Sequence, residues 1–327
     1  MEDQDRAELC FPQLFNSSCR KPEISQSDVV LMDLLFFICV FTVTLNLLVI
    51  ISVSHFRQLH TPTNLLILSL AVSDFLTGLD SMLEAHKQTA CWFLGDIMCS
   101  LHVYVSSIFL SVSTGDMVLI SVDRYVAICD PLHYSTRVTV TRVKICICIS
   151  WICSVVYYSI ILKNELTQPG MNNFCYGQCV VIIHYISGIV DSVLSVIAPV
   201  TVIIILYMRV FVTAVSQARA MRSHVAAVTL QHSGTVMNKK SELKAARTLG
   251  VVVLVFLMCF CPYYCISYVQ ISSNSALPIA SGLFLSYINP CLNPVIYALF
   301  YPWFRKAIRL IFSLQILQPG SRETNML

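Results

Sequence analysis

The sequence predicts an all-α membrane protein, a bundle of seven transmembrane helices followed by a short amphipathic eighth helix. Hydrophobic residues make up 56% of the 327 residues and charged residues only 12%, whereas a soluble domain carries roughly 25% charged residues. Seven apolar segments alternate with polar loops, and each is long enough to cross a bilayer as a helix. Lipid must therefore be the solvent for much of the surface.

The predicted spans divide the chain into an N-terminal segment (1–28), a transmembrane domain (29–300) and a C-terminal segment (301–327). No repeat relates the two halves, which argues against an inverted-repeat transporter. The seven spans cover residues 29–54, 64–86, 97–128, 143–162, 180–208, 249–272 and 277–300.

The distribution of Lys and Arg predicts the orientation. One set of loops, together with the C-terminal segment, is rich in these residues, whereas the opposite loops hold only Lys87 and Lys163. By the positive-inside rule the N-terminus is then extracellular and the C-terminus cytoplasmic. Asn16, in the sequon Asn16-Ser17-Ser18, falls on the predicted outer side, where glycosylation occurs. The cationic set is Arg57, Arg137, Arg142, Lys144, Arg219, Arg222, Lys239, Lys240, Lys244, Arg247, Arg305, Lys306 and Arg309.

The C-terminal segment begins with an amphipathic pattern. Residues 302–312 alternate apolar and basic residues at helical spacing, which is typical of a helix lying in the membrane interface. We expect residues 318–327 to be disordered and the polar stretch 217–241, between the fifth and sixth spans, to be mobile.

The third predicted span contains the most informative motif. It ends at its inner side in Asp123-Arg124-Tyr125. An Arg there can simply extend its side chain toward the headgroups, so the three residues alone are weak evidence. Within the same span lies Asp116, which we interpret as structural, facing the second and fourth spans near Trp151.

Other spans carry a buried acid and prolines. Asp74 lies in the middle of the second span, where an isolated carboxylate is costly and by default functional. Pro199, Pro262 and Pro294 lie inside the fifth, sixth and seventh spans, where proline permits a kink. Proline is also simply common in membrane helices.

These motifs resemble those of the rhodopsin class of G-protein-coupled receptors. The resemblance includes Asn293-Pro294-Val295-Ile296-Tyr297 and the single residues Asn46, Asp74 and Trp151. Within that class, the residues at 55–65, 242–250 and 301–306 are similar to those of the trace-amine-associated receptors, in particular fish olfactory amine receptors. The similarity covers all seven segments and the inner loops.

The resemblance implies how the inner end works. Arg124 would be held at rest by Asp123 and by Glu242 at the base of the sixth span. It would be freed to meet a heterotrimeric G protein when that helix swings outward. Tyr207, Asn293 and Tyr297 would complete this switch.

The resemblance also implies an allosteric sodium ion. Its ligands would be Asp74, Ser113, Asn289 and Asn293. The residue after Asn289 is Pro290, where relatives usually carry Ser, so the chain departs from the family pattern here. No other cofactor is expected.

Two disulfides are implied as well. Cys99 and Cys179 match the bond that ties the third helix to the second outer loop, in an oxidising compartment. Trace-amine-associated receptors carry a second loop cysteine bonded to the N-terminus. We expect the pair Cys19–Cys175, with Cys10 as the alternative partner of Cys175.

Two positions depart from the family. Phe260 stands where the sixth span usually carries a Trp. Ser106 stands where the third span usually carries the Asp that binds the ligand ammonium. The charge that would hold an amine is therefore missing from its usual place.

We hypothesise that Asp191 in the fifth span replaces the missing counter-ion, which would turn the ligand around in its pocket. Asp191 lies eight residues before Pro199, roughly 12 Å toward the outer side. A carboxylate there needs a cation or strong donors, and we expect none nearby on the fifth span. Alternatively, Asp191 is hydrogen-bonded to a neighbouring helix or faces water. Asp80 and Glu84 in the second span are rival counter-ions, or partners for the second charge of a diamine. The other predicted ligand contacts are Ser106, Phe260, Tyr263, Tyr264 and Tyr287.

The predicted function is that of a cell-surface amine receptor coupled to a cyclic-AMP-stimulating G protein of the Gs or olfactory type. A receptor for a non-amine ligand and an amine transporter remain the alternatives. A photoreceptor needs a Lys in the seventh span, and residues 277–300 contain none. No nucleophile–base pair supports an enzyme, and a net charge of +3 gives no support for a nucleic-acid partner.

Overall fold

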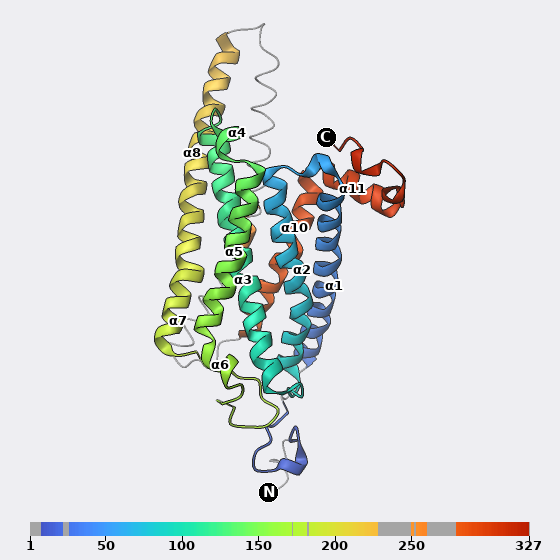
Figure 1. Cartoon of the computed structure of the whole chain (residues 1–327), viewed down its shortest axis with the longest axis vertical. Helices are drawn as coiled ribbons and strands as arrows, with labels where there is room; N and C mark the ends of the chain where they lie inside the picture. The colour runs from blue at the N-terminus through green and yellow to red at the C-terminus, as the bar shows by residue number, and fades with distance from the viewer. Residues whose placement is uncertain are drawn as a thin grey trace.

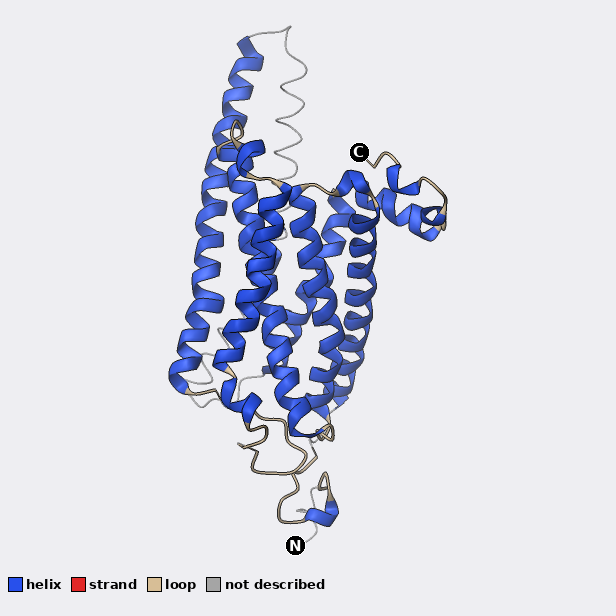
Figure 2. Ribbon diagram, in the orientation of Figure 1, coloured by secondary structure: helices blue, strands red, loops and turns tan. Residues whose placement is uncertain are grey.

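A computed structural model describes residues 8–21, 26–171, 173–181, 183–227, 250–251, 253–259 and 279–326. This part of the chain is a bundle of long helices (Figure 1), and Figure 2 shows no strand in it. Two isolated β-bridges, Leu9 with Arg20 and Ser18 with Tyr176, are the extended pairings in the described ranges. The predicted all-α class is confirmed.

Five of the described helical segments are long and apolar enough to span a membrane. The predicted sixth span is described only at residues 250–251 and 253–259, which are helical. Short helices lie in the loops or at the ends: η1 (Pro12–Leu14), η2 (Arg57–Leu59), α4 (Tyr134–Arg137), α6 (Lys163–Thr167), η4 (Gln315–Leu317) and η5 (Ser321–Glu323). The long helices are α1 (Gln26–His55), α2 (Pro62–Thr89), α3 (Gly95–Cys129), α5 (Val140–Ile161), α7 (Tyr185–Ser192) continued by η3 (Val193–Ile197) and α8 (Ala198–Ala227), α10 (Ile279–Phe300) and α11 (Pro302–Phe312).

Threonine caps begin two of these helices. The Thr61 side chain accepts a hydrogen bond from the backbone N–H of Asn64 at the start of α2. The Thr139 side chain does the same for Arg142 at the start of α5. Each cap satisfies one of the backbone donors that a helix start leaves unpaired.

The fifth span contains a wide turn at η3, whose five residues form a π-helical segment. The backbone N–H of Ala198 donates to the carbonyl of Val193, five residues back. Pro199 follows directly and has no N–H to donate, so the regular bond to the preceding turn is lost here. This turn sets the direction in which the residues before it point.

Helix α3 is the centre of the bundle. It packs against α2, α5 and α8, while α1 packs against α2 and α10. The N-terminal segment and α6 lie at one end of the bundle, called the amino end below. The C-terminal segment, α4 and α11 lie at the other, called the carboxyl end (Figure 1). Large apolar side chains are exposed around the outside, as expected for a lipid-facing surface; examples are Phe36, Phe37, Ile152, Ile160 and Phe211.

Helix α11 has the predicted amphipathic pattern. Trp303, Phe304 and Ala307 are buried, whereas Arg305 and Lys306 are exposed. The short eighth helix is therefore confirmed.

The expectation of a disordered C-terminal segment is wrong for residues 318–326. The side chain of Met326 is buried in the main hydrophobic core, and its backbone N–H donates to Gln58 Oε1 at 2.9 Å. Ser321 Oγ lies 2.9 Å from His55 Nε2, and Arg57 pairs with Glu323 at 3.5 Å. Polar groups at the end of α1 and in η2 thus bind those of the segment, and the Met326 side chain packs into the core.

The polar stretch after the fifth span is also partly helical. Helix α8 continues to Ala227, through the first part of the 217–241 segment that we expected to be mobile. Residues 228–241 lie outside the described ranges.

Candidate functional site

Asp191 lies on α7 immediately before the π-helical turn. Its Oδ1 accepts hydrogen bonds from Ser195 Oγ at 2.9 Å and from Tyr158 Oη of α5 at 3.1 Å. Both donors are neutral, and within the described ranges no Lys, Arg or His forms an ion pair with Asp191. The expectation that the fifth span offers no donor is wrong because Ser195, one turn later, points back at the carboxylate. A bond to a neighbouring helix, the alternative for Asp191, is also present.

A cavity of about 310 Å³ adjoins this network, between α3, α5 and the fifth span. Ser195 and Tyr157 lie on its wall. Serines and one threonine from α3 and α5 supply most of its other polar groups, so the lining can donate hydrogen bonds but holds no charge. The remaining lining residues are Ser111, Thr114, Gly115, Ser150, Cys153, Ser154, Leu194 and Pro199.

The two acids of α2 lie on the other side of α3 and are paired with a histidine that the sequence argument missed. His102 of α3 is buried, with Nδ1 2.8 Å from Asp80 Oδ1 and Nε2 2.9 Å from Glu84 Oε2. Lys87 Nζ lies 2.6 Å from the same oxygen of Glu84. The available signal was the spacing of Asp80 and Glu84, one helical turn apart on α2, together with a histidine near the start of the next span.

Ser106 belongs to this cluster. Its hydroxyl donates to Asp80 Oδ2 and also lies 2.7 Å from the carbonyl of His102. The residue at the family's amine-binding position therefore contacts the second span in this structure.

Asp74 is fully buried and lies against two of the expected sodium ligands. Asn293 Nδ2 donates to its Oδ2 at 2.8 Å, and Ser113 Oγ to its Oδ1 at 3.4 Å. Asn289, one turn before Asn293 on α10, has both polar side-chain atoms buried without a hydrogen-bond partner in the described ranges. Carboxylate and amide oxygens are ligands that hard cations prefer, so these residues fit a sodium ion.

Asp116 is buried, and both of its oxygens lack a hydrogen-bond partner among the described residues. Trp151 Nε1 donates to Ser69 Oγ of α2 at 3.2 Å. The indole therefore anchors α5 to α2 through this serine.

The Asp123–Arg124 pair is buried near the carboxyl end of α3. Arg124 Nε donates to Asp123 Oδ2 at 3.0 Å, and Arg124 Nη2 to Thr63 Oγ1 at 2.7 Å. Thr63 and Tyr134 both donate to Asp123, at 2.9 and 2.8 Å. These two hydroxyls were not predicted; they join the pair to α2 and to the loop after α3.

The structure describes the remaining predicted switch and ligand residues only in part. The hydroxyls of Tyr207 and Tyr297 are buried without a hydrogen-bond partner in the described part of the chain. Tyr287 is half-buried on α10. Glu242, Phe260, Tyr263 and Tyr264 lie outside the described residues.

Cysteine pairs organise the amino end. Cys99 and Cys179 form a disulfide with Cα atoms 5.5 Å apart, the pairing implied by the resemblance. Cys10 is bonded to Cys91, with Cα atoms 5.8 Å apart. Cys10 as the partner of Cys175 is therefore wrong in this structure, because the loop before α3 holds a cysteine that the sequence argument left out.

Cys19 and Cys175 are adjacent free thiols in the structure, not a disulfide. Burial and the neighbouring Cys175 raise the pKa of Cys19 to about 11. Backbone hydrogen bonds join the N-terminal segment to the loop before α7 here, from Cys19 N–H to Tyr176 O at 3.1 Å and from Tyr176 N–H to Ser17 O. The predicted disulfide Cys19–Cys175 is therefore not present in this structure, although the two thiols are neighbours.

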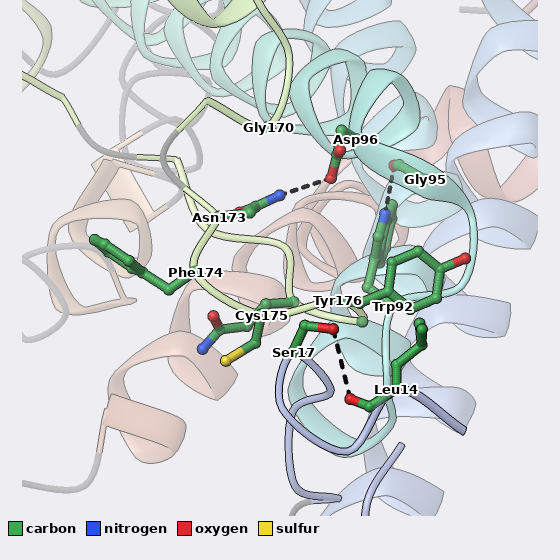
Figure 3. A pocket seen from close by; sticks show the side chains of 12 residues that line it. Leu14, Ser17, Trp92, Gly95, Asp96, Gly170, Asn173, Phe174, Cys175 and Tyr176 are labelled. Atoms are coloured by element: carbon green, nitrogen blue, oxygen red, sulfur yellow. Dashed lines mark hydrogen bonds between the residues drawn. The ribbon is translucent and has the colours of Figure 1, made fainter. Parts of the chain in front are cut away.

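A second cavity of about 360 Å³ lies beneath this N-terminal segment (Figure 3). Its walls come from the N-terminal segment, the loop before α3 and the loop before α7. Asn173 Nδ2 donates to Asp96 Oδ1 at 2.7 Å, and Trp92 Nε1 to Gly95 O at 2.8 Å. Asn16 is exposed nearby in the chain, at the same end of the bundle.

Comparison with known proteins gives consistent matches over the whole chain. Residues 45–297 match the family described as 7 transmembrane receptor (rhodopsin family). Trace amine-associated receptor 13c of Danio rerio is 36% identical over 99% of this chain and 98% of its own length. Trace amine-associated receptor 8c of Rattus norvegicus is 39% identical, over 99% and 97%. Trace amine-associated receptor 1 of Mus musculus is 34% identical, over 90% and 92%.

Proposed function

The chain belongs to the trace amine-associated receptors within the rhodopsin family of seven-transmembrane receptors, and we propose that Asp191 holds the ammonium group of its amine ligand. Membership makes it a cell-surface, multi-pass receptor rather than an enzyme. It responds to a small molecule and acts through a G protein. The proposal concerns where the ligand's charge is bound.

The observation that carries the proposal is the kind of partner that Asp191 has. Its two donors, Tyr158 and Ser195, are neutral, so its charge is left for a cation to balance. A carboxylate inside a membrane span is costly when it is not paired. The family's usual acid is replaced by Ser106, which leaves Asp191 as the counter-ion on this side of α3.

We propose further that the amino end of the bundle is extracellular. The excess of Lys and Arg in the loops of the carboxyl end supports this orientation. The two disulfides at the amino end support it as well, because such bonds persist in an oxidising environment. An amine would then enter from outside, at the level of α7.

Coupling to a cyclic-AMP-stimulating G protein of the Gs or olfactory type is proposed on the resemblance to olfactory amine receptors. An allosteric sodium ion at Asp74 is proposed on the buried amide of Asn289, which has no hydrogen-bond partner among the described residues. Bound there, the ion would supply a positive charge to Asp74, while Ser113 and Asn293 orient that carboxylate.

A cyclic-AMP reporter assay with a panel of amines tests the ligand site. Asp191→Ala should lose at least about tenfold in amine potency, since a hydrogen bond to a charged group is worth roughly 1.5–3 kcal/mol. Asp191→Glu should keep part of the response because it keeps the charge. Asp33→Asn, which removes an exposed acid of α1, is the matched control and should respond like wild type.

Two outcomes would contradict the assignment of the ammonium to Asp191. A wild-type response from Asp191→Ala together with a silent Asp80→Ala or Glu84→Ala would place the ammonium on α2. A wild-type receptor that responds to no amine of the panel would favour the second candidate, a receptor for a non-amine ligand. In that case the bonds from Tyr158 and Ser195 give Asp191 a structural role.

A further inference from the structure

We propose that His102 is an internal cation that closes the Asp80–Glu84 pair to ligands, so that the receptor is selective for amines with a single ammonium group. This rests on the proposed role of Asp191 and adds a residue that determines which amines fit. The protein would thus carry two acidic positions beside α3, of which only one is open to a ligand.

The geometry around His102 favours a charged ring. A carboxylate oxygen lies within 2.9 Å of each imidazole nitrogen, from Asp80 on one side and Glu84 on the other. A carboxylate only accepts, so both nitrogens must donate, and the imidazole makes both bonds only in its protonated form. The His102 side chain is 1% exposed, which keeps competing water away.

Two further side chains contact the same carboxylates. Ser106 donates to the second oxygen of Asp80, and Lys87 Nζ lies 2.6 Å from Glu84 Oε2. Trp92 stacks over the His102 ring, with centroids 5.9 Å apart and planes inclined by 28°, an arrangement that favours a cation. Two carboxylates therefore face two cations, and the cluster carries no net charge.

Asp191 provides the contrast. It has neutral donors and no ion pair within the described ranges. A second ammonium reaching Asp80 or Glu84 would have to displace a buried imidazolium that already makes two charged hydrogen bonds, each worth roughly 1.5–3 kcal/mol. A diamine would thus leave one of its charges unpaired in the pocket, which is unfavourable.

Removing the internal cation should change the selectivity. In His102→Gln, the ring charge is lost while the side chain keeps one amide donor. The α2 pair then has an uncompensated negative charge at the place where a second ammonium can bind. Monoamines should be affected little, because their charge lies at Asp191.

The test compares straight-chain monoamines with α,ω-diamines of increasing length, from propane- to decanediamine, in a cyclic-AMP reporter assay at matched surface expression. On the wild-type receptor, each monoamine should be at least about tenfold more potent than the diamine of equal length. In His102→Gln, one or more diamines should gain about tenfold or more while monoamine potency stays within about threefold. His102→Gln combined with Asp80→Asn and Glu84→Gln should abolish that gain.

The outcomes separate this inference from the proposed function. Wild-type receptors that prefer diamines would overturn it without any variant being needed. An Asp191-dependent monoamine response with no diamine gain in His102→Gln would overturn it while leaving the role of Asp191 intact. A monoamine response that survives Asp191→Ala would instead show that the proposed function has failed.

Discussion

The acids on the membrane-spanning helices of this receptor differ in the partners that neutralise them. Asp123 faces Arg124, and Asp80 and Glu84 face His102 and Lys87. Asp191 has only neutral donors, and Asp74 has an amide and a hydroxyl. An unpaired carboxylate is costly inside a membrane. An acid that is already paired with a cationic side chain therefore has little tendency to bind a ligand cation. At the acids that have neutral donors, a bound ammonium group or metal cation stabilises the protein most.

Arg124→Ala should abolish amine-evoked cyclic AMP while the receptor still reaches the cell surface. The Arg124 side chain is buried against Asp123 and Thr63 near the carboxyl end, and the proposed mechanism needs it to meet the G protein. The readout is the reporter response at equal surface staining. Arg142→Ala, which removes a cation of the α4–α5 region, should signal normally; undiminished signalling by Arg124→Ala would remove this residue from the coupling site.

Tyr134→Phe should raise ligand-independent signalling. The tyrosine hydroxyl donates to Asp123 Oδ1 at 2.8 Å, and losing one such bond costs roughly 1 kcal/mol. Without this hydrogen bond Asp123 is less well positioned to pair with Arg124. Basal cyclic AMP should therefore increase, several-fold at most. Basal signalling equal to or below that of wild type would show that the hydroxyl does not stabilise the resting state.

At the scale of elements, the fifth span depends on one residue for its shape. Pro199 follows the π-helical turn Val193–Ile197, and Asp191 lies on the helix just before that turn. Closing the turn to regular α-helical geometry would rotate α7 relative to α8, since a π-helical turn contains an extra residue. The direction of Asp191 is therefore a property of the helix and not of the aspartate alone.

Pro199→Ala is expected to lower amine potency by about tenfold without loss of surface expression, since it permits the regular hydrogen bond and turns Asp191 away from its present position. Dose–response curves for the same amine panel measure the effect. Val202→Ala, at an exposed position three residues later and outside the wide turn, is the control. A potency loss of equal size in the control would show that the region responds to any substitution.

The positions of the membrane spans were largely predictable from the sequence, whereas the side chains that contact the acids of the candidate site were not. Apolar length and flanking charges predict where the spans lie, because the bilayer requires both. His102 was missed because a lone histidine in an apolar span has no periodic signal, and its partners lie on another helix. The ordered C-terminal segment was missed because its stability comes from long-range contacts with Gln58 and His55, which local composition does not reveal.

At the scale of the whole molecule, covalent bonds at the amino end join distant parts of the chain. Cys99→Ser or Cys179→Ser should block surface delivery, because this bond fixes α3, the central helix, to the loop before the fifth span. Cys175→Ser should be milder, since Cys175 lies beside an N-terminal segment that covers the bundle. Surface immunostaining of the full chain measures both effects.

Cys10→Ser provides the matched comparison. The Cys10–Cys91 and Cys99–Cys179 bonds close loops of similar length, 81 and 80 residues. The chain-entropy account therefore predicts similar stabilisation for both, about 4.5 kcal/mol. If Cys10→Ser reaches the cell surface normally while Cys99→Ser is retained inside the cell, the position of the disulfide determines its importance. If both variants are retained equally, loop closure determines it.

The bond between Cys10 and Cys91 also constrains the order of events during synthesis. The two cysteines stand before α1 and after α2, so they meet only when both helices have been threaded into the bilayer as a hairpin. In the proposed orientation, Cys10 reaches the outer side of the membrane before Cys91 and stays reduced or transiently paired until the second span has been inserted. Closure of this bond therefore marks the moment at which the first two spans have been inserted with the correct topology.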